Sequence, residues 1–146
     1  MKRILLGLCI GTALAFPFLA YTLSPTGKTI KVSVSIKQNL LPEKSDGWPL
    51  YIYAARPNTR LPLSSYKGKV SDLPISITLD ESMYLLPELT LKDAKQVVVV
   101  AKISKSTDPH KKSEQDLIGF SRIVSFDQGL NQQVSLVIDQ TDKITK

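Results

Sequence analysis

The chain has 146 residues, of which 42% are hydrophobic and 22% are charged, and its formal net charge is +6. This composition is that of one globular domain with a hydrophobic core, and it excludes an intrinsically disordered chain. The positive charge is mild and lacks the concentrated basic stripe of a nucleic-acid-binding domain, so we expect no nucleic-acid partner.

The first 24 residues have the pattern of an export segment. Lys2 and Arg3 form a positive start, and an apolar run follows from residue 4 to residue 23. A run of this length suits a signal peptide or an uncleaved membrane anchor, because about 20 apolar residues span a bilayer. Small residues are poorly placed for cleavage, which favours an anchor with the remaining chain outside. Cys9 lies within this run, so the exported part has no cysteine for disulfide or thiolate chemistry.

After a short linker at residues 25–28, apolar and polar side chains alternate in one segment after another. This period of two predicts about seven β-strands, at residues 29–37, 50–56, 62–70, 74–80, 97–104, 117–126 and 133–139. The strand at 62–70 contains proline and lysine and is expected at a sheet edge. Gly119 indicates a β-bulge within its strand.

No long helical pattern follows residue 24, so the expected fold class is all-β. One-sided strands need a second sheet to cover their apolar face. We therefore expect an antiparallel β-sandwich over residues 29–140, behind one N-terminal apolar helix, with a small β-barrel as the alternative. Residues 141–146 are expected to form a tail.

Residues suited to catalysis or metal binding are few. His110 is the single histidine and lies in a charged loop beside two lysines, so it supports neither a zinc set nor a catalytic triad. Asp72, Asp80 and Glu81 lack the spacing of a calcium loop and are better explained as turn residues that accept backbone hydrogen bonds. Heme binding is disfavoured for want of an axial ligand other than His110. We expect no enzyme activity, no metal site and no cofactor.

Three tyrosines on predicted strands, Tyr51, Tyr53 and Tyr66, suggest a stacking platform for a ligand. Aromatic side chains also occur on strands simply because they fit the pleated surface. The structural role is the favoured interpretation, and clustering of these rings on one face of a sheet would count against it.

The loop at residues 81–96 begins with an unusually apolar run: Met83, Tyr84, Leu85 and Leu86. One interpretation is that this run plugs an open end of the sandwich. The other is that it forms an adaptable apolar patch that holds a partner segment. The plug is favoured because large exposed apolar patches are rare on monomers, and the exposure of these side chains distinguishes the two.

Several segments occur in the order and spacing of a known family. They are YIYAAR (51–56), LPLSSYKGKVSDLPISITLDESM (61–83), PELTL (87–91), VVVVAKISKS (97–106) and QDLIG (115–119). Over about residues 30–125 the chain resembles the C-terminal periplasmic domain of the CcmI/CycH-type cytochrome c biogenesis factor. It departs from that pattern at Glu81, where the family has aspartate, and at Thr107, where the family has glycine. We expect no helical repeat region of that family in these residues.

The resemblance implies a non-enzymatic, periplasmic accessory module of cytochrome c maturation, tethered to the inner membrane through residues 4–23. Its expected partner is apocytochrome c or the heme-ligation complex. The expected contacts are the apolar residues Met83, Tyr84, Leu85 and Leu86 with the basic residues Arg56, Lys102 and Lys105. The alternative is a membrane-anchored structural β-sandwich module of another envelope complex.

Overall fold

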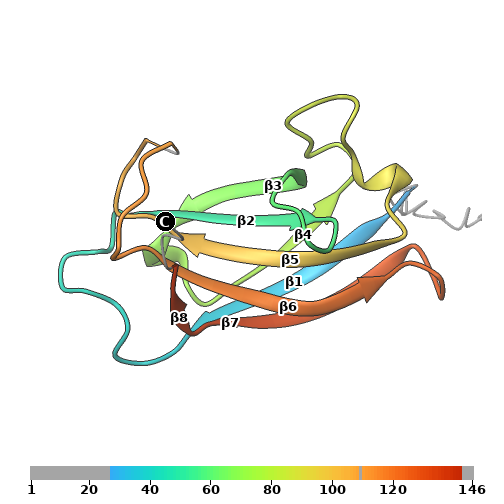
Figure 1. Cartoon of the computed structure of the whole chain (residues 1–146). Helices are drawn as coiled ribbons and strands as arrows, with labels where there is room; N and C mark the ends of the chain where they lie inside the picture. Colours follow the sequence, from blue (N-terminus) through green and yellow to red (C-terminus); the bar gives the residue numbers. More distant parts are fainter. Residues whose placement is uncertain (1–26, 109, 143–146) are drawn as a thin grey trace, which may run out of the picture.

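Two β-sheets make up the part of the chain that the computed structural model describes, residues 27–108 and 110–142 (Figure 1). The strand order is β4-β1-β7 in one sheet and β3-β2-β5-β6-β8 in the other. Their bounds are β1 (Thr29–Ile36), β2 (Pro49–Ala55), β3 (Pro62–Lys69), β4 (Ile75–Asp80), β5 (Gln96–Ile103), β6 (Leu117–Ser125), β7 (Asn131–Ile138) and β8 (Gln140–Thr141). The predicted all-β sandwich is confirmed, and the barrel alternative is wrong because the strands form two separate sheets.

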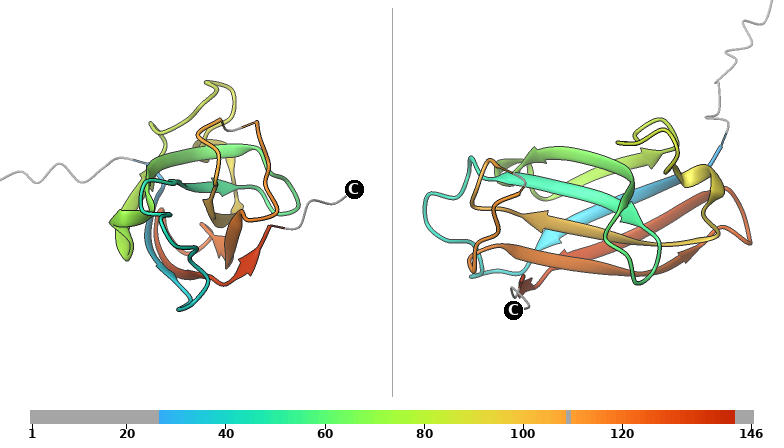
Figure 2. Two further views of the ribbon diagram at one scale, coloured as in Figure 1. Left: turned by 90° about the vertical axis from the view of Figure 1, so that its left-hand side faces the viewer. Right: turned by 45° about the horizontal axis from the view of Figure 1, so that its top comes forward.

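The apolar positions of the alternating strands form one core cluster. It lies between the two sheets, whose arrangement Figure 2 shows. Fully buried side chains come from both sheets: Ile30, Val32 and Leu79 from one, and Leu50, Ile52, Val97, Val99 and Ile103 from the other. Burying each large side chain of this kind contributes about 1.5–3 kcal/mol. The side chains between these positions in the sequence therefore point outward on both faces of the sandwich.

One strand pairing differs from the prediction of a purely antiparallel fold. β1 lies in the middle of its sheet and pairs antiparallel with β4 on one side and parallel with β7 on the other. All other pairings between the described strands are antiparallel. Period-two alternation shows which face of a strand is buried but not the direction of its neighbour, so the sequence pattern did not reveal this pair.

Gly119 has a different role from the bulge that its sequence context indicates. Ala101 pairs with Gly119 in regular register, and the irregularity of the β5–β6 ladder lies further along, between Val98 and Val100. A Cβ atom on Gly119 would overlap the Val137 carbonyl oxygen and lie 2.8 Å from the Cα of Ile138. Glycine is therefore needed where β6 of one sheet crosses close to the backbone of β7 in the other.

Both ends of the described chain are held. Lys28 donates its backbone N–H to Glu81 (2.8 Å), and its ammonium donates to the carbonyls of Lys92 (2.8 Å) and Ala94 (2.6 Å). At the other end, β8 pairs with β6, and the side chain of Asp142 is buried. Residues 140–142 thus belong to the domain rather than to a tail.

Two short 3₁₀ helices complete the secondary structure, η1 (Val70–Asp72) and η2 (Leu91–Asp93). The second is a single short turn within residues 81–96, in agreement with the absence of a long helical pattern there. Within residues 27–108 and 110–142, no helix is long and apolar enough to cross a membrane. The predicted export segment, residues 1–24, lies outside the described residues.

Candidate functional site

The outward side chains of β2, β3 and β5 form lateral rows across the five-stranded sheet. Strand register places Lys67, Tyr51 and Lys102 side by side in one row. The next row brings Ser65 beside Tyr53. Directly opposed residues on neighbouring strands have Cβ atoms about 4.5–5.5 Å apart, so each row is a continuous surface.

A groove of about 470 Å³ runs along these rows. We call it the tyrosine groove, and its lining residues are Tyr51, Tyr53, Arg60, Pro62, Ser65, Lys67, Leu85, Lys102 and Ser104. Three of the lining residues are cationic and none is acidic. The groove therefore offers a positive, aromatic and partly apolar surface to solvent.

Tyr51 lies at the centre of the groove. The Lys67 ammonium is over its ring, 5.7 Å from the ring centroid, in a cation–π contact. The Tyr51 hydroxyl is buried and has no hydrogen-bond partner among the atoms of the described chain. A buried hydroxyl without a partner is rare, because it loses its bonds to water without replacing them.

A buried charge network supports the floor of the groove. Lys102 Nζ lies 3.0 Å from Asp142 Oδ2 and 3.8 Å from Asp116 Oδ2. Arg60 Nη1 lies 3.8 Å from the second carboxylate oxygen of Asp142, while its side chain remains 62% exposed. The two aspartates thus compensate Lys102, and most of the Arg60 side chain remains open to solvent.

Asp116 also fixes the loop between β5 and β6. Its side chain is 1% exposed and accepts hydrogen bonds from the backbone N–H groups of Lys105 (3.0 Å) and Ser113 (3.1 Å). Backbone donors of this kind satisfy a buried carboxylate without another charged group. The loop is therefore positioned by the same aspartate that faces Lys102.

Burial affects the second tyrosine of the groove. Burial raises the pKa of the Tyr53 phenol above its ordinary value of 10.0, the charge of Arg60 counteracts part of the rise, and Asp142 adds to it. A phenol is neutral at physiological pH even at its ordinary pKa, and the rise moves its ionisation to still more alkaline pH.

The apolar run after β4 divides into a buried and an exposed part. Met83 is partly buried against the core, and its carbonyl accepts a hydrogen bond from the backbone of Ser65 on β3 (2.8 Å). Tyr84, Leu85 and Leu86 are 45%, 65% and 51% exposed. The plug interpretation is correct for Met83 and wrong for the next three residues, which belong to the loop between β4 and η2. This loop projects from the sandwich (Figure 1).

The structure brings together two of the predicted partner contacts, beside Tyr51 and Tyr53. Leu85 and Lys102 both line the tyrosine groove. Arg56 is exposed and lines a neighbouring hollow on the same face, together with Arg60 and Phe120. Lys105 is exposed in the loop after β5. The predicted set is thus spread along one side of the molecule rather than gathered at one point.

Sequence reasoning missed Arg60 and Lys67 and gave the tyrosines a structural role. Tyr51 and Tyr53 do share an outward face, whereas Tyr66 is partly buried against the core. Tyr51 and Tyr53 are two residues apart on one strand, as are Ser65 and Lys67 on the next. This spacing indicates that each pair lies on one face of the sheet. Their meeting depends on strand register, which the sequence did not supply.

The other predicted features behave as turn and loop residues. Asp72 accepts a hydrogen bond from the Lys69 backbone (2.9 Å), and Asp80 accepts one from the Ser82 backbone (2.8 Å). His110 is exposed. No group of three or more His, Cys, Asp or Glu suited to a metal ion occurs in residues 27–108 and 110–142.

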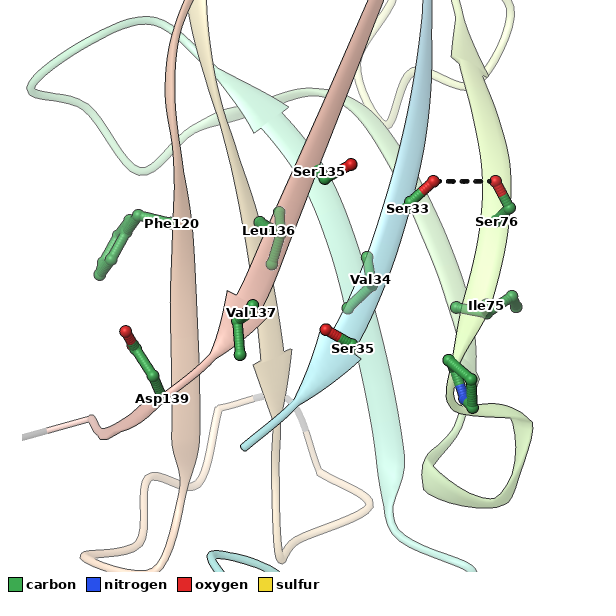
Figure 3. Close-up of a pocket in the computed structure, with 11 residues that line it drawn as sticks. Ser33, Val34, Ser35, Ile75, Ser76, Phe120, Ser135, Leu136, Val137 and Asp139 are labelled. Atoms are coloured by element: carbon green, nitrogen blue, oxygen red, sulfur yellow. Dashed lines mark hydrogen bonds between the residues drawn. The ribbon is translucent and has the colours of Figure 1, made fainter. Parts of the chain in front are cut away.

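A second hollow, of about 660 Å³, lies over the outer face of the three-stranded sheet (Figure 3). Short hydroxyl side chains dominate this face, and Ser33 and Ser76 are hydrogen bonded to each other across β1 and β4 (3.2 Å). Phe120 and Asp139 lie to one side of the serines. No cation lines this hollow, so we take the tyrosine groove as the candidate site.

Comparison with protein families decides the relationship of the chain. The model of the Ig-like domain of cytochrome c-type biogenesis protein H matches residues 30–139. The chain belongs to this family. The match covers every strand from β1 to β7 and confirms the resemblance found in the sequence. Neither the curated proteins nor the solved structures gave a match to the chain. Its membership of the Ig-like family of cytochrome c-type biogenesis protein H therefore rests on the family model.

Proposed function

We propose that the chain is a non-enzymatic, periplasmic accessory module of cytochrome c maturation. Its protein partner is apocytochrome c or the heme-ligation complex, and residues 4–23 tether it to the inner membrane. Membership of the Ig-like domain family of cytochrome c-type biogenesis protein H supports the pathway. The contact surface in this proposal is the tyrosine groove together with Tyr84, Leu85 and Leu86.

One observation carries the assignment of the surface. Leu85 is 65% exposed and lines the same groove as Tyr51, Tyr53 and Lys102. Large aromatic and apolar side chains beside cations are typical of the residues that dominate protein interfaces. Exposed leucines on an otherwise well-packed domain cost solubility, which makes an interaction role the better explanation of this loop.

Purification of the tagged full chain from membranes in detergent tests the proposal, with mass spectrometry of the bound proteins. We expect enrichment of apocytochrome c or of heme-ligation proteins. The double variant Leu85→Ser/Leu86→Ser should lower this enrichment at least tenfold, since about 1.4 kcal/mol is tenfold in affinity and burial of each leucine is worth about 1.5–3 kcal/mol. Leu130→Ser is the matched control, because Leu130 is 51% exposed in the loop before β7.

Two results would contradict the proposal. One is enrichment of proteins from an unrelated envelope complex, which would favour a structural module there. The other is equal enrichment by the unmodified chain and the Leu85/Leu86 variant. Heme staining of c-type cytochromes in cells that lack the chain gives an independent readout, and we expect reduced staining.

A further inference from the structure

The charges around the tyrosine groove are unbalanced on the solvent side. Asp142 and Asp116 are buried and compensate Lys102. Lys67 is exposed and forms no ion pair within the described chain, and Arg60 meets only Asp142, at 3.8 Å. An anionic group placed in the groove would therefore face Lys67, which no acidic side chain neutralises, and Arg60, whose side chain is 62% exposed despite its contact with Asp142.

The Tyr51 hydroxyl is a hydrogen-bond donor that has no acceptor among the described residues. Register places this tyrosine between Lys67 and Lys102, and its oxygen is buried without a hydrogen-bond partner among the residues described. A ligand oxygen reaches the hydroxyl only when the side chains that cover it move aside; it would then accept the hydrogen bond of Tyr51 on the ring that Lys67 contacts. Charge-assisted hydrogen bonds of this type are stronger than neutral ones.

The remaining walls of the groove are apolar or neutral. Leu85 and Pro62 line it, and the Tyr53 ring lies one row away from the lysines. Burial raises the pKa of Tyr53, so this ring brings no negative charge that would repel an anion. The groove thus combines an anion position with adjacent space for apolar side chains, at a volume that suits a few residues of a peptide.

We propose that the tyrosine groove binds an acidic side chain, aspartate or glutamate, flanked by apolar residues in a segment of the protein partner. The carboxylate lies between Lys67 and Arg60 and accepts the hydrogen bond of Tyr51. The flanking apolar side chains pack on Leu85 and Tyr53. This inference rests on the proposed function for the existence of a protein partner and adds the chemistry that the partner presents.

Selection from a library of displayed random linear peptides tests the inference with the full chain in detergent. The selected peptides should carry aspartate or glutamate next to leucine, isoleucine or an aromatic residue. Replacing that acid with its amide in a synthetic peptide should weaken binding about tenfold. Lys67→Gln in the protein should have a similar effect, whereas Lys31→Gln, on the exposed face of β1, should have none.

Tyr51→Phe tests the binding role of the hydroxyl in a variant that we expect to fold as stably as the unmodified chain. It removes a buried hydroxyl that makes no bond in the described chain, so the thermal midpoint should stay the same or rise. Affinity for the selected peptide should nevertheless fall severalfold, because the ligand loses its donor. Unchanged affinity in both Tyr51→Phe and Lys67→Gln would overturn the inference.

Other outcomes also overturn it: selection of basic or uncharged peptides, no selection above the unselected library, or binding only to vesicles that contain anionic lipid. The outcome of the co-purification described above is independent of the outcome of the peptide selection. If acidic peptides bind the groove but no cytochrome maturation protein co-purifies, the groove chemistry stands and the pathway assignment falls. If maturation proteins co-purify but acidic peptides do not bind, the reverse holds.

Discussion

The two outer faces of the sandwich differ although both consist of alternating strands. The outer face of β4, β1 and β7 carries Ser33, Ser35, Ser76 and Ser135, with a hydrogen bond between two of these hydroxyls (Figure 3). The outer face of β3, β2 and β5 carries tyrosines, lysines and a buried charge network. Short hydroxyl groups can form hydrogen bonds with one another and with water. The charged and aromatic side chains of the second face are better suited to contact with another protein.

This difference distinguishes the serine-bearing face from the face that we propose for binding. The serine face has the larger hollow, about 660 Å³ against about 470 Å³, but lacks large anchoring groups other than Phe120 at its side. Binding free energy comes from buried aromatic and basic anchors more than from the size of a hollow. The smaller groove is therefore the better candidate for recognition.

The largest loss of stability is expected from a change at the close crossing of β6 and β7, where the two sheets meet. Gly119→Ala should destabilise the domain by about 3 kcal/mol, because the new Cβ overlaps backbone of β7 that cannot move alone. Gly47→Ala is the control, since a Cβ there meets nothing within 4 Å. Urea unfolding measures both, and equal midpoints for the two variants would contradict the close crossing of β6 and β7.

Removal of the charge behind the groove should have the next largest effect. Asp142→Ala leaves Lys102 with only the more distant Asp116, and it removes the partner of Arg60. We expect a loss of about 2 kcal/mol in the free energy of unfolding. Asp127→Ala, at an exposed turn, should change it by less than about 0.5 kcal/mol. Similar unfolding curves for both would show that the network contributes nothing.

The free energy of unfolding should depend on alkaline pH through Tyr53, which lies on the groove side of the sandwich. Its raised pKa means that the unfolded phenol ionises at a lower pH than the folded one. Stability from this group is fully present below about pH 10 and decreases as pH rises through the folded pKa. Unfolding measured from about pH 9 to pH 11 should show a smaller decrease in Tyr53→Phe. An identical pH dependence in the variant would contradict the assignment.

The smallest effect is expected on the serine face. Ser76→Ala removes an exposed hydrogen bond to Ser33 and should change the free energy of unfolding by less than about 0.5 kcal/mol. Binding of an acidic peptide should be unaffected. A loss of binding in this variant would move the functional surface to the other sheet.

Strand positions were predictable because alternation depends only on which side chains meet the core. The predicted strand at 62–70 is β3, at the edge of its sheet, and the apolar positions of 97–104 are buried in β5. Strand direction and contacts between sheets depend on distant residues. The parallel β1–β7 pair and the crossing at Gly119 therefore could not be read from local pattern.

The candidate site was predictable in part. Tyr84, Leu85 and Leu86 stood out because apolar runs are unusual in loops, and their exposure follows from the chain reversing outside β3. Asp116 and Asp142 gave no signal, because an aspartate in a polar segment has the same local appearance whether it is exposed or buried. Only the fold places both carboxylates behind Lys102.

The parallel pairing of β1 and β7 has a mechanical consequence. The domain begins with β1 at one end of the sandwich, and β7 ends at the opposite end (Figures 1 and 2). A tensile force applied between these ends acts along the β1–β7 ladder, from Thr29–Asn131 to Ile36–Ile138, and loads its hydrogen bonds together in shear. The fold can thus resist stretching between an attachment at its start and a partner pulling at its far end.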